Sequence, residues 1–364
     1  MAQPIPVLLM TRSLGLGGSE RQLTEIAKAL NRASFAPHVG CFHAEGFRAE
    51  ELRACGVPVV EFPVSSFLSL SALTGARVVG RYLREHGIQL VHTFDVPLNL
   101  FGVPVTRWYR VPRVISSQRA HRDLTPGLRR HLLRITDRLV DAVVVNSEAV
   151  RRDLIETDRV PPALIHLCYN GLDAAAFPPP SGRPVEPVVI GVICALRPEK
   201  GLETLLAAFA QLNKPSAAQL LIVGSGPALP GLQALAAKLG LQGRCVFEPA
   251  TKQVAERLRA IHIFVLPSLS EAFSNSLMEA MACGCCVVAS RVGGNPELVI
   301  EGESGLLFRP GDSADLARCL EQLLRDTVLR DRLAAAAIAR IQQHFTLARA
   351  AERMGEIYRV VLGG

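Results

Sequence analysis

Apolar and polar positions follow two alternating patterns along the first half of the chain. Short apolar runs that are typical of buried strands cover residues 6–10, 37–42, 58–62, 90–94, 113–117 and 141–147. Amphipathic helical periodicity fills several of the intervals, most clearly residues 19–32. Continuous apolar strands that are separated by helices indicate a parallel sheet covered on both faces.

The same alternation repeats in the second half. Strand-like runs cover residues 188–196, 218–227, 245–250, 261–268 and 285–290, and helical patterns cover residues 201–213, 229–240, 251–260 and 275–284. Between the two series, residues 177–187 contain five prolines, a composition that is typical of an interdomain linker. A length of 364 residues also suits two domains better than one.

We therefore predict an α/β protein with two doubly wound, Rossmann-like domains that face each other across a cleft. The predicted parts are an N-terminal domain, a linker, a C-terminal domain and a final helix that could pack on either domain, at residues 1–177, 178–187, 188–345 and 346–364. Ligands of open α/β sheets bind at the carboxyl ends of the strands, so the candidate chemistry should lie there.

Two carboxylates follow the strand-like run 261–268. Glu271 and Glu279 stand eight positions apart, and Ser276 with Glu279 has the spacing of a helix capping box. Capping alone would explain Glu279, and a solvated carboxylate near a helix start would explain Glu271. A helix N-terminus at a strand end also presents free N–H groups, so the segment suits a polyhydroxylated ligand that carries phosphate.

Cations and glycines follow the first strand of each series. Arg197 and Lys200 stand after residues 188–196, where a planar fork and a point charge could together hold phosphate. After residues 6–10, the chain reads "LGLGGSERQL", whose glycines allow a ligand to approach the backbone closely. This loop is neither a G-x-G-x-x-G dinucleotide motif nor a Walker A loop.

Charge and cysteine content narrow the class of protein. The net charge is +7, and residues 107–138 hold nine arginines against two aspartates. Such a tract favours an anionic partner, which could be a membrane surface, a phosphorylated lipid or a nucleic acid, although few aromatics accompany it for base stacking. Among the nine cysteines only Cys283, Cys285 and Cys286 cluster, and we interpret them as buried core residues of a reducing cytoplasm rather than metal ligands.

Membrane insertion is not expected from the sequence. No apolar run approaches the ~18–20 residues that span a bilayer. The start of the chain lacks a basic segment before its short apolar run, so it is a poor secretory signal. We expect a cytoplasmic protein whose basic tract could contact the inner face of the membrane.

Six segments together resemble one enzyme family. They are "GGSER", "VNSEAVRRDL", "CYNGLDAAAF", "LRPEKGL", "VGSGP" and "SEAFSNSLMEAMACGCCVVASRVGGNPELV", which begin at residues 17, 145, 168, 196, 223 and 270. In this order they resemble the group 1 (family 4) retaining glycosyltransferases, which have the GT-B fold and an E-x7-E segment. The resemblance covers nearly the whole chain.

The resemblance implies how a nucleoside-diphosphate sugar would be held, with UDP as the default nucleotide. The implied donor-binding residues are Glu271 and the backbone of Phe273, Ser274 and Asn275 for the sugar, Glu279 for the ribose, Glu248 and Thr251 near the base, and Gly17 and Gly18 from the other domain. Arg197 and Lys200 would neutralise the diphosphate leaving group. The sequence has no D-x-D pair, so we expect catalysis without a metal or another cofactor, with front-face attack and no covalent nucleophile.

One segment departs from the family. Many relatives carry a histidine after the strand at 113–117, where this chain reads "QRAHRD". Arg119 could support the leaving phosphate or the sugar there, and His121 could orient the acceptor. A buried structural arginine and a surface histidine are equally compatible with the sequence. His92 could line the same cleft, but a histidine that ends a buried strand is more often structural.

The sequence thus predicts a hexosyltransferase that moves sugar from a nucleotide donor to a lipid-linked or cell-surface glycan acceptor, as in polysaccharide biosynthesis. A sugar-nucleotide epimerase of the same fold is one alternative. A nucleotide-sugar-binding protein with weakened catalysis is another, which the altered segment after residue 117 favours. Nucleic-acid binding through the basic tract is a third, and it predicts duplex affinity that falls steeply with salt.

Overall fold

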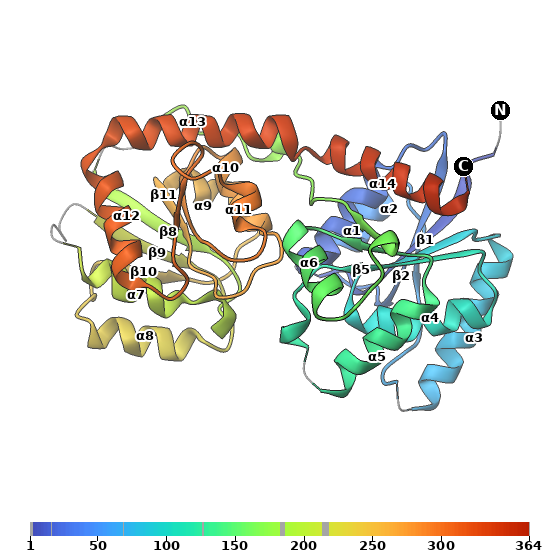
Figure 1. The fold of residues 1–364 in the computed structure, drawn as a ribbon. Helices are drawn as coiled ribbons and strands as arrows, with labels where there is room; N and C mark the ends of the chain where they lie inside the picture. Colours follow the sequence, from blue (N-terminus) through green and yellow to red (C-terminus); the bar gives the residue numbers. More distant parts are fainter. Residues whose placement is uncertain are drawn as a thin grey trace. The chain divides into compact units, whose positions relative to one another are not determined.

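The computed structural model describes residues 3–15, 17–67, 69–125, 127–182, 186–212 and 218–363. The chain forms two units, of which the first comprises residues 1–171 with 347–364 and the second residues 172–346. Each unit is built on one parallel sheet with helices on both faces, as the alternating sequence pattern predicts (Figure 1).

The first unit contains seven strands and its helices follow them in alternation. The strands are β1 Ile5–Ser13, β2 Phe35–His43, β3 Val59–Glu61, β4 Leu90–Thr93, β5 Arg113–Gln118, β6 Ala142–Val145 and β7 Ile165–Leu167. The α-helices are α1 Gly18–Ala29, α2 Phe47–Ala54, α3 Leu70–Glu85, α4 Val96–Trp108, α5 Leu128–Thr136, α6 Glu148–Glu156 and α14 Leu347–Leu362. Three 3₁₀ turns are η1 Arg122–Leu124, η2 Asp137–Leu139 and η3 Pro162–Leu164.

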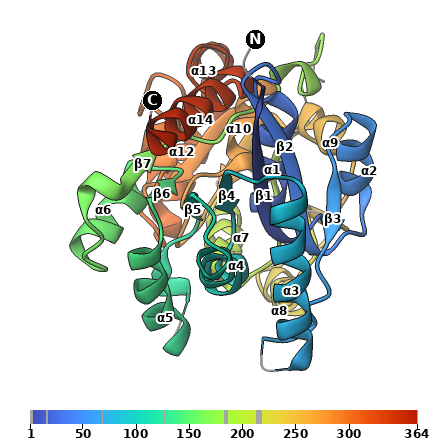
Figure 2. The same ribbon diagram turned by 90° about the vertical axis from the view of Figure 1, so that its right-hand side faces the viewer.

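The strand order of the first sheet is β3-β2-β1-β4-β5-β6-β7, and every pair is parallel. In register, Val7 of β1 pairs with Pro37 on β2 and with Leu90 on β4. One face of this sheet shares a core with α1, α2 and α14. On the opposite face α3, α4 and α5 lie next to one another (Figure 2).

The C-terminal helix α14 belongs to the first unit. Its buried side chains include Met354, Ile357 and Tyr358, which enter the same core as α1 and the sheet. The Tyr358 hydroxyl lies 2.9 Å from Nδ1 of His92 on β4, and both residues are fully buried. The sequence left the packing partner of this helix open, and the apolar face of the helix covers the first sheet.

The second unit contains six strands and a similar set of helices. The strands are β8 Val188–Ile193, β9 Ala218–Val223, β10 Cys245–Glu248, β11 Ile263–Leu266, β12 Cys286–Ser290 and β13 Leu306–Phe308. The α-helices are α7 Leu202–Ala210, α8 Leu229–Lys238, α9 Val254–Ala260, α10 Asn275–Ala282, α11 Asn295–Leu298, α12 Ser313–Arg325 and α13 Thr327–His344. Two 3₁₀ turns are η4 Ala174–Ala176 and η5 Pro198–Lys200.

The strand order of the second sheet is β10-β9-β8-β11-β12-β13, again with parallel pairs throughout. From β8 the chain continues outward to β9 and β10, and then returns to β11 on the other side of β8. The sheet therefore reverses its winding between β8 and β11. Doubly wound sheets bind ligands at such a reversal, so the loops after β8 and β11 mark the place to search for a site.

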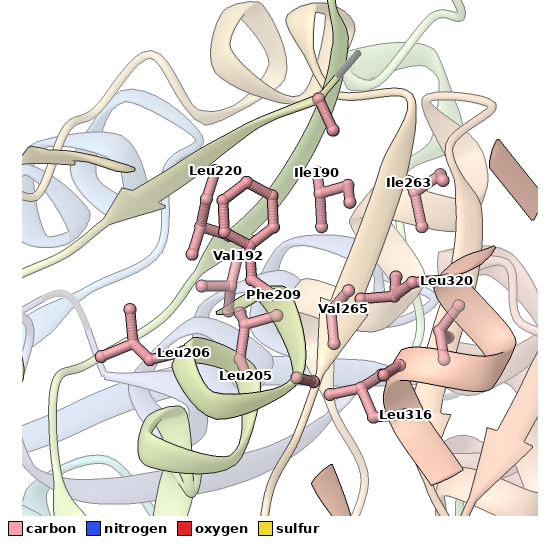
Figure 3. Close-up of a cluster of buried hydrophobic side chains, with 14 of the residues drawn as sticks. Ile190, Val192, Leu205, Leu206, Phe209, Leu220, Ile263, Val265, Leu316 and Leu320 are labelled. Carbon is pink, nitrogen blue, oxygen red and sulfur yellow. The ribbon is translucent and has the colours of Figure 1, made fainter. Parts of the chain in front are cut away.

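An apolar core fixes this sheet against α7 and α12. Figure 3 shows Ile190 and Val192 of β8 facing Leu205 and Phe209 of α7, with Leu316 of α12 on the same side of the sheet. All five side chains are fully buried. Because interiors are packed as densely as organic crystals, this core gives the loops at the strand ends a rigid base.

The boundary between the units differs from the predicted linker. The first unit ends at Gly171 and the second begins at Leu172, before the proline-rich residues 178–187. The described residues of that segment therefore belong to the second unit. The physical reason is a local pairing: the Leu172 N–H donates to the Phe345 carbonyl at 2.9 Å, and Leu172 forms a parallel bridge with Thr346. Proline content marks an irregular chain path, but this backbone pairing sets where the second unit begins.

The clustered cysteines lie in the core, as predicted. Cys283, Cys285 and Cys286 are buried, and burial raises the pKa of the Cys286 thiol to about 12. Within the described residues, no group of three or more His, Cys, Asp or Glu side chains could hold a metal ion. Across the same part of the chain, no helix combines the length and the apolar character that a membrane span requires.

Candidate functional site

A lysine and a glutamate meet where the winding of the second sheet reverses. Lys200 ends η5 in the loop after β8, and Glu271 lies in the loop after β11. Lys200 Nζ donates to Glu271 Oε2 at 2.6 Å, and the two side chains are 21% and 12% exposed. The sequence predicted both residues as site residues, and the structure brings them into direct contact.

The backbone holds this pair in place. Gly201 follows Lys200 in the left-handed region (φ 61°, ψ 31°), and a Cβ there would lie 2.4 Å from the Pro267 carbonyl oxygen. Only glycine tolerates both conditions. The Leu269 N–H donates to the Glu199 carbonyl at 2.8 Å, so the loop after β11 is tied to the loop after β8. Lys200 and Glu271 are therefore held on two connected loops.

Electrostatics keep Lys200 charged. Burial alone would lower the pKa of Lys200, but the adjacent Glu271 carboxylate outweighs burial, and the pKa lies above its ordinary value. Arg197 immediately precedes η5, and its side chain is 63% exposed. Its guanidinium lies 3.9 Å from the Glu199 carboxylate. One cation of this loop is thus fixed by a partner, and the other projects toward solvent.

The helix after Glu271 begins at Asn275, where the sequence pattern predicts, but its cap differs from the prediction. Ser274, and not Ser276, is the N-cap of α10: its hydroxyl accepts from the Leu277 N–H at 3.2 Å. The predicted capping box of Ser276 with Glu279 is therefore wrong, because Ser276 is already the second residue of the helix. Glu279 is buried within α10 and does not close its first turn.

Replacing Ser274 with alanine should lower the free energy of unfolding by about 1 kcal/mol, the usual cost of losing a cap hydroxyl. Ser276→Ala should cost less, because the Ser276 hydroxyl contacts the Ser274 hydroxyl, at 3.2 Å, and does not cap the helix. Urea unfolding midpoints of the two variants measure the difference. Equal losses would contradict the assignment of the cap.

Other predicted donor-binding residues also lie at the carboxyl edge of the second sheet. The Phe273 side chain is buried and packs on Phe345, with ring centroids 5.5 Å apart. Asn275 is the first residue of α10. Glu248 ends the edge strand β10 and pairs with Arg257 Nε at 3.0 Å, while the Thr251 hydroxyl accepts from the Gln253 N–H at 3.0 Å. These residues lie at or after the ends of β10 and β11.

Several residues that shape these loops were not among the predicted site residues. Gly224 and Gly226, in the "VGSGP" segment, lie so close to the loop after β8 that a Cβ would fall 2.0 Å from the Cys194 carbonyl oxygen and 2.3 Å from that of Leu196. Ser268 lies beside Glu271 and donates to its Oε2 at 3.3 Å. The glycine spacing was a usable signal, whereas nothing in the sequence distinguishes Ser268 from other serines.

In the first unit, the predicted glycines open α1. Gly17 is the N-cap and Gly18 the first residue of this helix. A residue that sequence reasoning missed supports the preceding loop: Arg48 of α2 is buried, and its Nε donates to the Gly15 carbonyl at 2.9 Å. The loop after β1 is thus held from the side by an arginine whose place only the fold reveals.

Arg119 follows β5 and is a half-buried cation. Its guanidinium stacks over the Phe94 ring at 5.4 Å and donates to the Asn170 amide oxygen. Burial lowers the pKa of Arg119 to about 10, so the group stays charged at neutral pH. Both of these partners are neutral, so neither supplies a counter-charge to the guanidinium. Cations with such surroundings are common at binding sites.

The two histidines near this segment have structural partners. His121 pairs with Asp153 of α6 through its Nδ1. His92 is fully buried between the Tyr358 hydroxyl and the Ser117 hydroxyl, each 2.9 Å from one of its ring nitrogens. Burial holds the pKa of His92 well below its ordinary value, so the ring is neutral. The structural interpretation of His92 therefore fits its surroundings.

Much of the basic tract is internally neutralised, which the charge count alone did not predict. Arg107 pairs with Asp141, Arg122 with Asp137 in a buried bidentate pair, and Arg130 with Asp158. Two of these three aspartates lie outside the tract that was counted. The net positive charge that remains on this surface is smaller than nine arginines suggest.

Two protein families match the sequence of this chain. The family described as "Glycosyl transferases group 1" matches residues 173–340, and "Glycosyltransferase Family 4" matches residues 16–176. The two matches meet close to the observed boundary of the units. Together they cover residues 16–340, which contain the second sheet and the strands of the first sheet from β2 to β7.

Curated relatives carry one recurring name. A D-inositol 3-phosphate glycosyltransferase of Acidothermus cellulolyticus is 30% identical over 317 residues, which cover 78% of this chain and 69% of that protein. One from Stackebrandtia nassauensis is 35% identical over 54% of this chain and 49% of its own length, so the chain spans about half of that relative. These names state a phosphorylated cyclitol, and they do not support the predicted lipid-linked or cell-surface glycan acceptor.

Solved structures share the fold over nearly the whole chain. The Anabaena protein HepE in complex with UDP-glucose aligns with a TM-score of 0.85 at 24% identity, over 98% of this chain and all of that one. A sucrose-phosphate synthase from Thermosynechococcus elongatus aligns with a TM-score of 0.86 at 22% identity, over 98% and 99% of the two chains. Both likenesses concern the fold and agree with the two parallel sheets described above.

Proposed function

Since the chain belongs to the group 1 (family 4) glycosyltransferases, we propose that it moves a hexose-type sugar from a UDP-sugar to a small phosphorylated polyol. The Lys200–Glu271 pair carries this proposal. It combines a cation for the diphosphate and a carboxylate for sugar hydroxyls in one rigid contact at the winding reversal of the second sheet. The co-crystallised UDP-glucose of HepE supports UDP as the nucleotide.

Each part of the donor has a matching group in the second unit. Lys200 and Arg197 would neutralise the diphosphate, assisted by the positive N-terminal end of α10. Glu271 would accept from the sugar hydroxyls, and Glu279 from the ribose hydroxyls. Glu248 and Thr251, after β10, would lie near the base. These roles follow the resemblance residue by residue.

The transfer step needs charge stabilisation and no covalent enzyme intermediate. The bond between the anomeric carbon and the diphosphate oxygen breaks, and its electron pair stays on the leaving oxygen beside Lys200 and Arg197. The acceptor hydroxyl oxygen forms the new bond on the same face of the sugar, which retains the anomeric configuration. Its proton passes to a leaving phosphate oxygen. The residues that we assign require no metal ion for this step.

Arg119 supports a phosphorylated acceptor. Its guanidinium is half-buried, charged and stacked on Phe94, and an anionic group of the substrate would supply a counter-charge. The names of the curated relatives point to a phosphate on a polyol. Gly17 and Gly18 would let a substrate approach the start of α1. His121, paired with Asp153, would orient the acceptor only if that ion pair opens.

The test is a transfer assay with a panel of UDP-glucose, UDP-galactose and UDP-N-acetylglucosamine and with inositol 3-phosphate as acceptor. We expect release of UDP that requires the acceptor and a product in which the anomeric configuration is retained. Acceptor-free conversion of the donor into another UDP-sugar would instead identify an epimerase. Donor binding without any release of UDP would identify a binding protein with lost catalysis.

A second surface of the first unit suits an anionic membrane. Helix α5 exposes apolar side chains, with Leu128 71%, Ile135 46% and Leu132 38% exposed, next to the exposed Arg129 and Arg138. A helix that turns leucines and arginines to solvent together has the composition of an interfacial helix. We therefore include peripheral binding to anionic lipid in the proposal.

Leu128→Ser should weaken binding to phosphatidylglycerol vesicles by about tenfold, because an inserted leucine contributes roughly 1.5–3 kcal/mol. Val328→Ser is the matched control, since Val328 is a comparably exposed apolar residue (78%) on α13 of the second unit. Vesicle flotation measures both. Equal binding of the two variants, or no preference for phosphatidylglycerol over phosphatidylcholine, would contradict the lipid contact.

A further inference from the structure

We propose that the segment after β12, residues 290–295, positions Glu271 for the donor sugar, and that Ser290 is its central positioning residue. This inference rests on the proposed function, because it assumes that Glu271 contacts the sugar. It adds residues that lie on another strand and that touch no substrate themselves.

A chain of buried polar groups runs from α11 to the Glu271 carboxylate. The Asn295 amide donates to the Ser290 carbonyl at 3.0 Å, and the Ser290 hydroxyl donates to the Ser268 carbonyl at 2.6 Å. The Ser268 hydroxyl in turn donates to Glu271 Oε2 at 3.3 Å. Ser268, Ser290 and Asn295 are all fully buried. The carboxylate is therefore held by Lys200 from one strand end and by this chain from two others.

The same two loops are also joined through their backbones. The Gly294 N–H donates to the Ala272 carbonyl at 3.0 Å and lies 3.3 Å from the Glu271 carbonyl. A Cβ on Gly294 would fall 2.2 Å from the Ala272 carbonyl oxygen, so only glycine allows this approach. The segment after β12 thus fixes both the backbone and the side chain of Glu271.

Stability alone does not account for this arrangement. The Asn295 side-chain oxygen is buried and lacks a hydrogen-bond partner among the described residues, a state that native structures normally avoid. Apolar residues of similar size would pack between β11 and β12 without that cost. Buried polar networks with such costs are typical of the supports behind functional groups, which must be held within a fraction of an ångström.

The Ser290 hydroxyl should affect the sugar part of the donor and not its nucleotide part. The nucleotide would contact Glu279 and the loops after β8 and β10, none of which receives a hydrogen bond from the Ser290 hydroxyl. The sugar would contact Glu271, whose position depends on that hydroxyl. Loss of the Ser290 hydroxyl should therefore weaken binding of the sugar part and leave binding of UDP unchanged.

The experiment compares the dissociation constants for UDP and for the panel UDP-hexose that the wild-type protein binds most tightly. For Ser290→Ala we expect an affinity for UDP within about twofold of wild type and a smaller ratio of UDP-hexose affinity to UDP affinity. We also expect kcat to fall by up to about 100-fold, the loss that a 1 Å misplacement can cause. Ser268→Ala removes the next hydroxyl of the chain and should change the same preference. Ser304→Ala is the control, because Ser304 is a buried serine of the same unit whose hydroxyl accepts from the Ile300 N–H.

The outcomes distinguish the two proposals. If Glu271→Ala changes the preference for UDP-hexose while Ser290→Ala and Ser268→Ala both behave like Ser304→Ala, the positioning role is refuted and the proposed function stands. If Glu271→Ala leaves the preference unchanged, the proposed sugar contact itself is wrong. Equal loss of UDP and UDP-hexose binding in Ser290→Ala would show a merely structural role and would also overturn the inference.

Discussion

Glu271→Ala is expected to lower kcat by about 100- to 1,000-fold, the range seen when one preorganised polar contact to a transition state is removed. The reason lies in two contacts that the substitution abolishes: the proposed one to the sugar hydroxyls, and the 2.6 Å contact that fixes Lys200. Stability should change little, since Glu271 lies on a loop outside the apolar core. We expect the melting temperature to move by less than about 4 °C. Steady-state transfer rates and thermal unfolding measure both quantities.

Glu321→Ala provides the control for this substitution. Glu321 also forms an ion pair, with Arg325 at 3.2 Å, but it lies on α12, which packs on a face of the second sheet. Its replacement should leave kcat within about twofold, because an exposed pair of this kind contributes at most about 1 kcal/mol to stability and nothing to the loops. Comparable losses of kcat in both variants would mean that removal of any paired carboxylate disturbs the enzyme.

Lys200→Met should reduce kcat by a similar factor of about 100 to 1,000, since it removes the buried cation proposed to stabilise the leaving diphosphate. The substitution keeps the length of the side chain and leaves Glu271 without its closest partner. Affinity for UDP should fall together with kcat, which distinguishes this variant from Ser290→Ala. Lys238→Met, on the last turn of α8, is the matched control and should have no effect on either quantity.

The pH dependence of the pair has a definite sign. The pKa of Lys200 is raised in the folded protein, so the pair contributes stability that is complete below the unfolded-state pKa of about 10.4 and is lost as pH rises through the higher folded-state pKa. Titration of Lys200 should therefore not limit activity between pH 6 and about 9. A kcat that falls with a midpoint in this range and that is abolished by Lys200→Met would contradict the assigned charge state.

The apolar runs of the sequence predicted most strands of both sheets, because buried parallel strands need continuous apolar residues. The run at 188–196 contains β8 and the run at 261–268 contains β11, and these two strands place Lys200 and Glu271 at the winding reversal. The three-residue strands β7 and β13 were missed. A strand of three residues is too short to show a period, so it cannot be told from a buried loop.

Long-range contacts were the part that sequence reasoning could not supply. The unit boundary depends on the pairing of Leu172 with Phe345 and Thr346, two adjacent residues that lie far from Leu172 in the sequence. The charge of the basic tract depends on Asp141 and Asp158, which lie beyond its end. Each of these partners becomes a neighbour only when the sheet has formed.

The site shows the same division between local and distant information. Glu271, Lys200 and Arg197 were predictable because motif spacing and strand ends determine their places. The start of α10 at Asn275 was predicted, but its cap was misplaced by two residues, because Ser274 and Ser276 are both acceptable caps and backbone geometry chooses between them. Ser290 supports Glu271 from a neighbouring strand, and no local pattern indicates that.

The most direct test of the central claim is a crystal structure of the protein with an unreactive UDP-hexose analogue. The account predicts that the diphosphate lies against Lys200, Arg197 and the start of α10, and that the sugar hydroxyls donate to Glu271. A bound analogue at any other edge of the second sheet, with the Lys200–Glu271 contact unchanged and remote from the ligand, would contradict it.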